Sequence, residues 1–187
     1  MNFILSSQRN GIYLCQRREI MGRLIQILRT DSEVIEIYSP KYDGEEDSEF
    51  EKFLKINGAR KEPQLRKFFD AIVSAVDIIR EVGARENLFR PEGRRIKALP
   101  LFISSNNKID KKIGKMRLYC LRYSEKILIL GNGGVSTLQK YEDDVWLNKC
   151  VNDLRIIDKI ITKELKRIRK TIDDKGAIKE VIENIDI

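Results

Sequence analysis

Histidine is absent from this 187-residue sequence, and cysteine is scarce. Without histidine there are no histidine-ligated metals and no Ser-His-Asp triad, so any acid–base chemistry must use Lys, Arg, Tyr, Asp or Glu. The three cysteines, Cys15, Cys120 and Cys150, are widely spaced and form no CxxC pair. This spacing predicts neither a zinc site nor a disulfide framework. We therefore expect no metal.

Long apolar runs are also missing. No stretch approaches the roughly 18 consecutive apolar residues that a membrane-spanning helix needs, and the opening residues lack the apolar segment of a signal peptide. Fold-like patterning begins only after Met21, which makes Met21 a candidate true start. We expect a cytoplasmic protein with no membrane partner, in which residues 1–30 form an N-terminal extension.

Charge, by contrast, is plentiful. Charged residues make up 35% of the sequence, and 36 Lys and Arg against 29 Asp and Glu give a formal net charge of +7. The charge is unevenly spread, because residues 31–52 are acidic whereas residues 85–126 and 155–170 are strongly basic. Such a distribution favours a polyanionic partner.

The hydrophobic pattern predicts an α+β fold. Residues 33–39 alternate as in a strand, Ser48 is a candidate N-cap of a short helix, and apolar residues from Leu65 to Ile79 recur at helical spacing until Gly83. Extended segments near 96–103, 116–123 and 127–130 follow, then a long amphipathic helix over 144–170. This order predicts a small antiparallel sheet with two helices packed on one face, plus a long C-terminal helix. The other face of the sheet is expected to stay open.

The glycine-rich stretch GNGG at 131–134 does not have the pattern of a nucleotide site. No Gly-Lys-Ser/Thr follows it, and Ser136 stands where GxGxxG would need its third glycine. We interpret it as the exit of a strand that needs positive φ angles, and we expect no small-molecule cofactor.

From Glu33 to about Lys159 the sequence resembles the RelE/HigB-like toxins of bacterial toxin–antitoxin systems. The resemblance implies a RelE/ParE-like domain over residues 31–171, followed by a C-terminal tail over 172–187. The stretches that carry it are EFEKFL, QLRKFFDAIVSAVDIIREVG, FRPEGRRIKALP, KMRLYCLRYSEKILILGNGG and STLQKYEDD.

The resemblance implies the toxin of a type II system, a ribosome-dependent endoribonuclease that cuts messenger RNA. Its partners would be messenger RNA on the ribosome and a cognate antitoxin, expected to be a small helix-turn-helix protein. The sequence departs from the family where relatives place basic residues directly after the final strand, because it has GNGGVST there. The positions that match implied catalytic residues are Arg95, Lys97, Arg117, Lys140 and Tyr141.

Four further residues are candidate RNA contacts. Arg94 and Arg122 are chosen for their charge, and Tyr119 and Tyr123 because aromatic rings stack on any base. The alternatives are a solvated surface charge for each cation and cross-strand packing for each tyrosine. For the whole protein, the alternatives are a non-catalytic RNA- or protein-binding module on the same fold and a gyrase-inhibiting ParE-like toxin. The nuclease hypothesis requires Arg95, Lys97 and Arg117 to converge on the open face.

Overall fold

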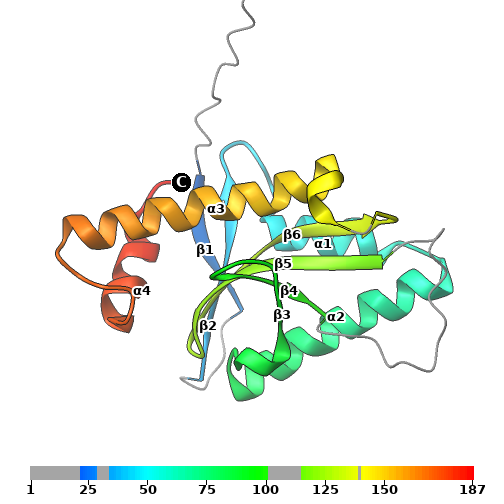
Figure 1. The fold of residues 1–187 in the computed structure, drawn as a ribbon, viewed down its shortest axis with the longest axis horizontal. Helices are drawn as coiled ribbons and strands as arrows, with labels where there is room; N and C mark the ends of the chain where they lie inside the picture. Colours follow the sequence, from blue (N-terminus) through cyan, green and yellow to red (C-terminus); the bar gives the residue numbers. More distant parts are fainter. Residues whose placement is uncertain (1–21, 29–33, 101–114, 139) are drawn as a thin grey trace, which may run out of the picture.

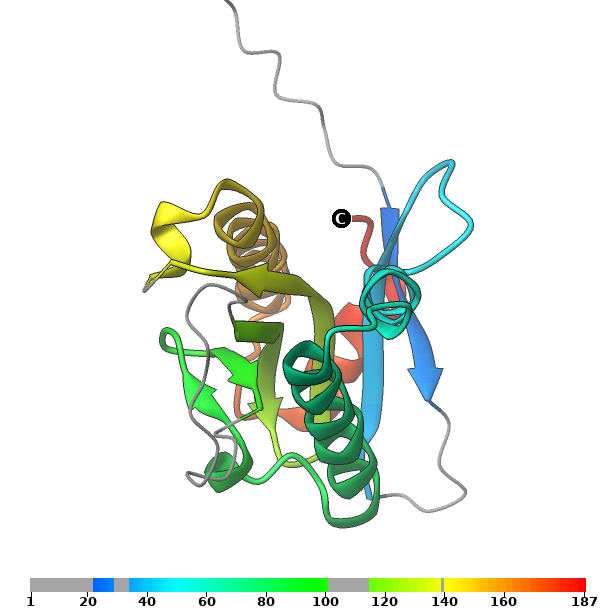
Figure 2. The same ribbon diagram turned by 90° about the vertical axis from the view of Figure 1, so that its right-hand side faces the viewer.

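The computed structural model describes residues 22–28, 34–100, 115–138 and 140–187. They form a single sheet with helices on both sides (Figures 1 and 2). The α+β class expected from the sequence is therefore confirmed. Within these described ranges, no helix has the apolar length that crossing a bilayer requires.

The sheet has six strands in the order β1-β2-β6-β5-β4-β3. Every neighbouring pair is antiparallel except β2 and β6, which run parallel, so the sheet is mixed and larger than the small antiparallel sheet expected. A parallel pair needs a crossover connection, and the chain between β2 and β6 begins with two helices. The strands are β1 (Gly22–Leu28), β2 (Glu36–Tyr42), β3 (Arg90–Pro91), β4 (Ile96–Leu99), β5 (Lys115–Ser124) and β6 (Ile127–Ser136).

Helices α1 (Glu49–Gly58) and α2 (Pro63–Val82) cover one face of the sheet. Ser48 caps α1 in a capping box with Glu51, because each side chain accepts a hydrogen bond from the other residue's backbone N–H. Gly83 ends α2 with a φ of 84°, in the left-handed region that glycine tolerates. The buried faces of both helices pack against alternate residues of β2, β5 and β6.

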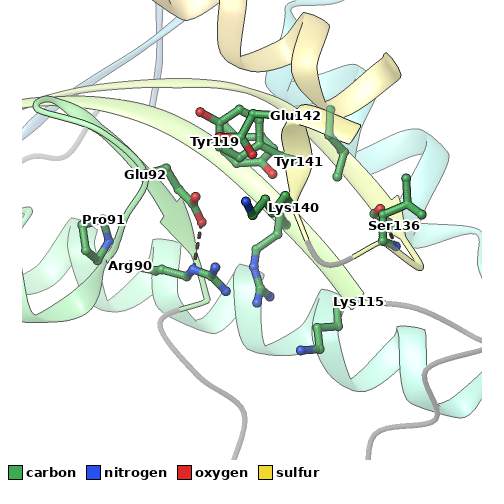
Figure 3. Close-up of a pocket in the computed structure, with 12 residues that line it drawn as sticks. Arg90, Pro91, Glu92, Lys115, Tyr119, Ser136, Lys140, Tyr141 and Glu142 are labelled. Carbon is green, nitrogen blue, oxygen red and sulfur yellow. Dashed lines mark hydrogen bonds and ion pairs between the residues drawn. The ribbon is translucent and has the colours of Figure 1, made fainter. Parts of the chain in front are cut away.

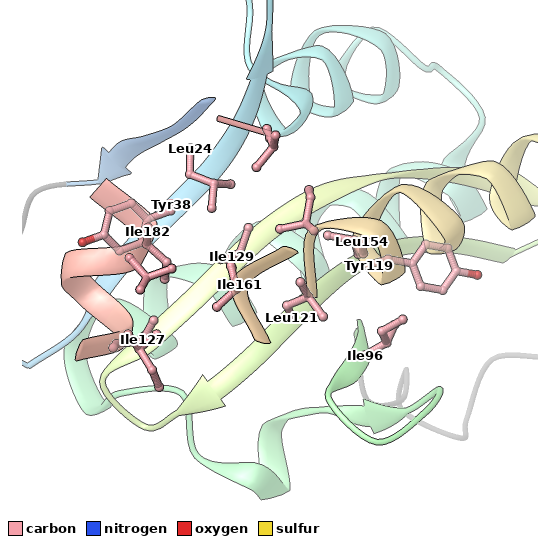
Figure 4. Packing of buried hydrophobic residues seen from close by; sticks show 14 of the residues in the cluster. Leu24, Tyr38, Ile96, Tyr119, Leu121, Ile127, Ile129, Leu154, Ile161 and Ile182 are labelled. Atoms are coloured by element: carbon pink, nitrogen blue, oxygen red, sulfur yellow. The ribbon is translucent and has the colours of Figure 1, made fainter. Parts of the chain in front are cut away.

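Helices α3 (Val145–Arg167) and α4 (Lys175–Asn184) cover the opposite face, which we expected to be open. Figure 4 shows Leu154 and Ile161 of α3 over Leu121 and Ile129 of the sheet, in one buried cluster. The expectation of an open face is thus wrong over most of the sheet. The physical reason is that the apolar stripe of α3 must itself be buried, and the sheet is the apolar surface available to it.

The GNGG stretch lies inside β6 and does not mark the end of the strand. Among the described residues, the glycines with positive φ are Gly44 and Gly83, so the interpretation of GNGG as a strand exit is wrong. A Cβ on Gly131 would lie 3.0 Å from the Leu154 side chain, and one on Gly134 would lie 3.3 Å from the Trp146 indole nitrogen. Because glycine has no side chain at these two positions, α3 can lie close against β6.

The folded unit extends beyond both boundaries predicted at 31 and 171. Strand β1 pairs with β2, although residues 22–28 fall in the predicted extension. The predicted tail contributes α4, whose Ile178 and Ile182 are buried, and the Ile187 N–H donates to the Gly22 carbonyl. Residues 1–21, with the candidate start at Met21, lie outside the described residues.

Candidate functional site

A cleft of about 400 Å³ opens where β5 begins and β6 ends (Figure 3). Its walls come from β3 and the turn after it, from β5, and from the segment that joins β6 to α3. Arg117 pairs in register with Gly134, which lies under the first turn of α3, so the cleft forms where the cover of this helix ends. The residues with functional side chains are the cations Arg90, Lys115, Arg117 and Lys140, the carboxylates Glu92 and Glu142, and the tyrosines Tyr119 and Tyr141.

Arg117 is a partly buried cation in this cleft. Its Nη1 donates a hydrogen bond to the Met116 carbonyl at 3.0 Å. No ion pair joins Arg117 to a carboxylate in the described part of the chain. Burial lowers the pKa of its guanidinium, and the charge of the nearby Arg90 lowers it further. A shielded cation without a paired anion is costly, and a bound anion would relieve that cost.

Glu92 faces the same cleft from the turn after β3. Its Oε1 lies 2.8 Å from the Arg90 Nε, the ion pair drawn in Figure 3. Burial nevertheless raises the pKa of the Glu92 carboxyl, outweighing the opposite effects of Arg90 and Arg117. A carboxylate with a raised pKa accepts a proton more readily near neutral pH, as a general base must.

Tyr119 and Tyr141 form the aromatic side of the cleft. Their ring centroids are 5.8 Å apart in an edge-to-face arrangement. Burial raises the pKa of the Tyr119 hydroxyl, so it stays protonated and can donate a hydrogen bond. The Tyr141 hydroxyl accepts a hydrogen bond from Nη2 of Arg155 in α3 at 2.8 Å, which joins the cleft wall to the helix.

The structure therefore brings together four of the nine predicted site residues. Arg117, Lys140 and Tyr141, predicted as catalytic, line one cleft with Tyr119, a predicted RNA contact. The shared location of Arg117 with Lys140 and Tyr141 follows from the pairing of β5 with β6, because the segment after β6 returns beside the start of β5.

Lys97 and Arg122 lie on the opposite face of the sheet, so the predicted convergence of Arg95, Lys97 and Arg117 is wrong. Lys97 pairs in register with Cys120, one residue from Tyr119, and successive residues of a strand point to opposite faces. Its ammonium is buried against Glu86, in the short 3-10 helix Glu86–Leu88. The Arg122 guanidinium reaches the same carboxylate at 2.9 Å.

Arg95 and Tyr123 hold α3 on the sheet. The Arg95 guanidinium contacts both oxygens of Asp158 in α3, at 2.8 and 2.9 Å, and the Tyr123 hydroxyl donates to the same carboxylate at 2.9 Å. Neither residue lines the cleft, and Arg94 lies exposed in the turn before β4, also outside the cleft lining. The roles predicted for Arg95 in catalysis and for Tyr123 in base stacking do not fit these positions.

Sequence reasoning missed Arg90, Glu92, Lys115 and Glu142, which also line the cleft. The turn Pro-Glu-Gly was a usable signal for two of them. It connects β3 to β4 as a hairpin, with Arg90 opposite Ala98, and this pairing carries Arg90 and Glu92 to the cleft. No comparable signal marks Lys115 or Glu142, whose position depends on the long-range pairing of β5 and β6.

No resident metal site is formed by the described residues, since they contain no group of three or more Asp, Glu or Cys side chains suited to holding an ion. What the cleft offers chemically is a set of cations around a shielded carboxylate. Comparison of the chain with protein-family models, with curated proteins and with solved structures finds no match.

Proposed function

We propose that the cleft binds the phosphate backbone of single-stranded RNA, and that the protein is a messenger-RNA endoribonuclease of the RelE/HigB-like kind. The convergence of Arg95, Lys97 and Arg117 that the hypothesis from the sequence required is absent, so the proposal is carried by the cleft around Arg117 in its place. The observation that carries this proposal is Arg117, a partly buried guanidinium with no carboxylate partner in the described residues. Arg90, Lys115 and Lys140 line the same cleft and add to its positive charge. Phosphate suits such a constellation, because guanidinium groups match its oxygens in geometry and the clustered cations complement its charge.

Cleavage requires a base for the ribose 2′-hydroxyl and positive charge at the phosphate. In the proposed reaction the 2′-hydroxyl proton passes to Glu92, and the 2′-oxygen forms a bond to the adjacent phosphorus. The bond from phosphorus to the 5′-oxygen breaks, and that oxygen takes a proton from water. Arg117 and Arg90 stabilise the charge that accumulates on the phosphate. This route needs no histidine, consistent with a sequence that has none.

The biological setting comes from the resemblance stated above. In that setting the protein is a type II toxin in the cytoplasm, the RNA is messenger RNA on the ribosome, and a separate helix-turn-helix antitoxin holds the protein inactive. The resemblance rests on an expected order of a strand, two helices, further strands and a helix. The elements from β2 to α3 follow this order, which supports the resemblance.

The test is to incubate purified ribosomes and a translated messenger with the protein and to map new RNA ends. The wild-type chain is expected to cut, and Arg117→Ala is expected to cut at least about 100-fold more slowly, as when one donor to a developing charge is removed. Arg85→Ala is the matched control, since Arg85 is an exposed arginine outside the cleft. An uncut messenger with the folded wild-type chain would remove the nuclease proposal.

A second candidate is a non-catalytic RNA-binding module that uses the same cleft. It is favoured by the positions of Arg95 and Lys97, which the resemblance implies are catalytic but which are paired with Asp158 and Glu86 away from the cleft. RNA binding that is lost in Arg117→Ala, without any cleavage by the wild type, would select this function. Intact RNA together with loss of gyrase supercoiling would select the ParE-like alternative.

A further inference from the structure

Helix α3 carries a row of exposed lysines along the side that faces the β3–β4 hairpin. Lys159, Lys163 and Lys166 line a shallow hollow of about 400 Å³ together with Arg95. In the described part of the chain none of the three lysines forms an ion pair. The hollow is thus bordered by three ammonium groups, with Asp158 as its carboxylate.

The acidic residues of α3 are paired with other cations. Asp153 binds Lys149 at 2.6 Å, and Glu164 binds Arg167 at 2.6 Å. Asp158 is held by Arg95, as described above. The lysines are therefore left as like charges at helical spacings of three and four residues, an arrangement that destabilises a helix. A polyanion lying along the row would remove this repulsion.

The row begins beside the cleft. Arg155 lies four residues before Lys159, on the same side of the helix, and its guanidinium contacts Tyr141 in the cleft wall. The β3–β4 hairpin also borders both sites, because Arg90 and Glu92 line the cleft whereas Arg95 lines the hollow. The cleft and the hollow are consecutive parts of one basic path.

We infer that an RNA strand bound in the cleft continues along α3 and places further phosphates against Lys159, Lys163 and Lys166. At 1.5 Å of rise per residue, these lysines extend the contact by about 10 Å. The contribution of this path to binding depends on RNA length. This inference rests on the proposed function of the cleft.

The experiment measures binding of two labelled single-stranded RNAs, of about 4 and about 16 nucleotides, over a series of salt concentrations. The variant K159Q/K163Q/K166Q is expected to bind the short RNA like the wild type. For the long RNA its log–log salt slope should fall by about 2, because each lost phosphate contact on a single strand contributes roughly 0.7. The control K61Q/K67Q/R85Q removes the same charge from exposed positions outside both the cleft and the hollow, and should leave the slope unchanged.

An unchanged slope for the long RNA in the α3 variant, or an equal loss in the control, would overturn this inference. Arg117→Ala separates that failure from failure of the cleft itself. If Arg117→Ala weakens binding of both RNAs while the α3 variant changes neither, the cleft proposal holds and only the path along α3 is wrong. If Arg117→Ala changes neither RNA, the proposed function fails.

Discussion

Two glutamates on opposite faces of the sheet show contrasting relations to their cationic neighbours. Glu86 is mostly exposed, receives Lys97 and Arg122, and has a pKa below its usual value, chiefly because Lys97 donates a hydrogen bond to it. Among the described residues Glu92 forms an ion pair with Arg90 and with no other cation, and burial raises its pKa. On the first face one carboxylate pairs with both strand cations, whereas the cleft on the second face contains Arg117, which forms no ion pair among the described residues.

The contrast shows that a basic residue on a strand does not by itself indicate an anion-binding site. Lys97 is buried and would be a costly isolated charge, but the segment after α2 brings Glu86 to it. Arg117 receives no such carboxylate in the described residues, and its face of the sheet opens into a cleft. Lys97 is a structural cation because a neighbouring segment supplies its carboxylate partner. Arg117 is a candidate functional cation because no described segment supplies one.

Replacing Glu92 with glutamine tests the contrast most severely. Removing a general base is expected to lower the cleavage rate by about 100-fold or more. RNA binding should become several-fold tighter, because the cleft loses a negative charge. In the wild type, cleavage should rise as the pH increases through the Glu92 pKa, which burial raises above that of an ordinary glutamate, and binding should strengthen as the pH falls through it. Rates and affinities measured over a pH series that starts near the ordinary glutamate pKa of about 4.3 and rises to neutral pH would test both trends.

Glu86→Gln is the control, because it removes a carboxylate of the same size on the other face. It should leave cleavage and RNA binding unchanged at neutral pH. If Glu92→Gln lowers cleavage and binding together, Glu92 maintains the shape of the cleft and is not the base.

The single substitutions Arg117→Met and Lys97→Met should have opposite effects: the first on RNA binding and the second on stability. Arg117→Met should weaken RNA binding by about 10–100-fold, the size of a lost charged hydrogen bond, with little change in stability. Lys97→Met should lower the free energy of unfolding by about 1–2 kcal/mol and leave RNA binding unchanged. Urea unfolding and fluorescence anisotropy on both variants measure the two quantities. Loss of RNA binding in a folded Lys97→Met protein would contradict the assignment.

The sequence was sufficient for the elements whose signals are local. The apolar spacing from Leu65 to Ile79 and the terminating Gly83 predicted α2, which the structure has at Pro63–Val82. The long helix expected over 144–170 is α3 at Val145–Arg167. Helical periodicity and caps depend on neighbours within a few residues, so they can be read from the chain alone.

The candidate site was only partly predictable because it depends on strand register. Whether Lys97 shares a face with Arg117 is set by the pairing of β4 with β5, and a shift of one residue would reverse it. The packing of α3 against the sheet is also long-range, and it depends on Asp158 meeting Arg95, 63 residues earlier in the chain. Composition showed that cations were abundant, but it could not show which of them find a carboxylate.

Removing Asp158 should weaken the attachment of α3 to the sheet. Asp158→Ala leaves the Arg95 guanidinium and the Tyr123 hydroxyl, both partly buried, without their shared acceptor. We expect the free energy of unfolding to fall by roughly 1–3 kcal/mol, the cost of stranding such groups. Chemical denaturation measures this loss, and Asp77→Ala in α2 is the control because its ion pair with Arg80 is exposed. An equal effect of both substitutions would mean that the Asp158 cluster does not hold α3.

The pH dependence of stability should report the Glu86 cluster with the smallest effect. A carboxyl whose pKa is lowered on folding stabilises the protein above its unfolded pKa, and this stability is lost as the pH falls through the folded pKa. The wild type should therefore lose stability from about pH 4.5 downward more steeply than Glu86→Gln, which has no proton to bind there. Since Glu86 is largely exposed, the difference between the two proteins should stay below about 1 kcal/mol. Denaturation curves of both proteins are measured at pH 7 and at about pH 3.5, where carboxyl groups are partly protonated. The change in unfolding free energy between the two pH values is then compared between the two proteins. Parallel losses in the two proteins would show that solvent screens the charges of the Glu86 cluster fully.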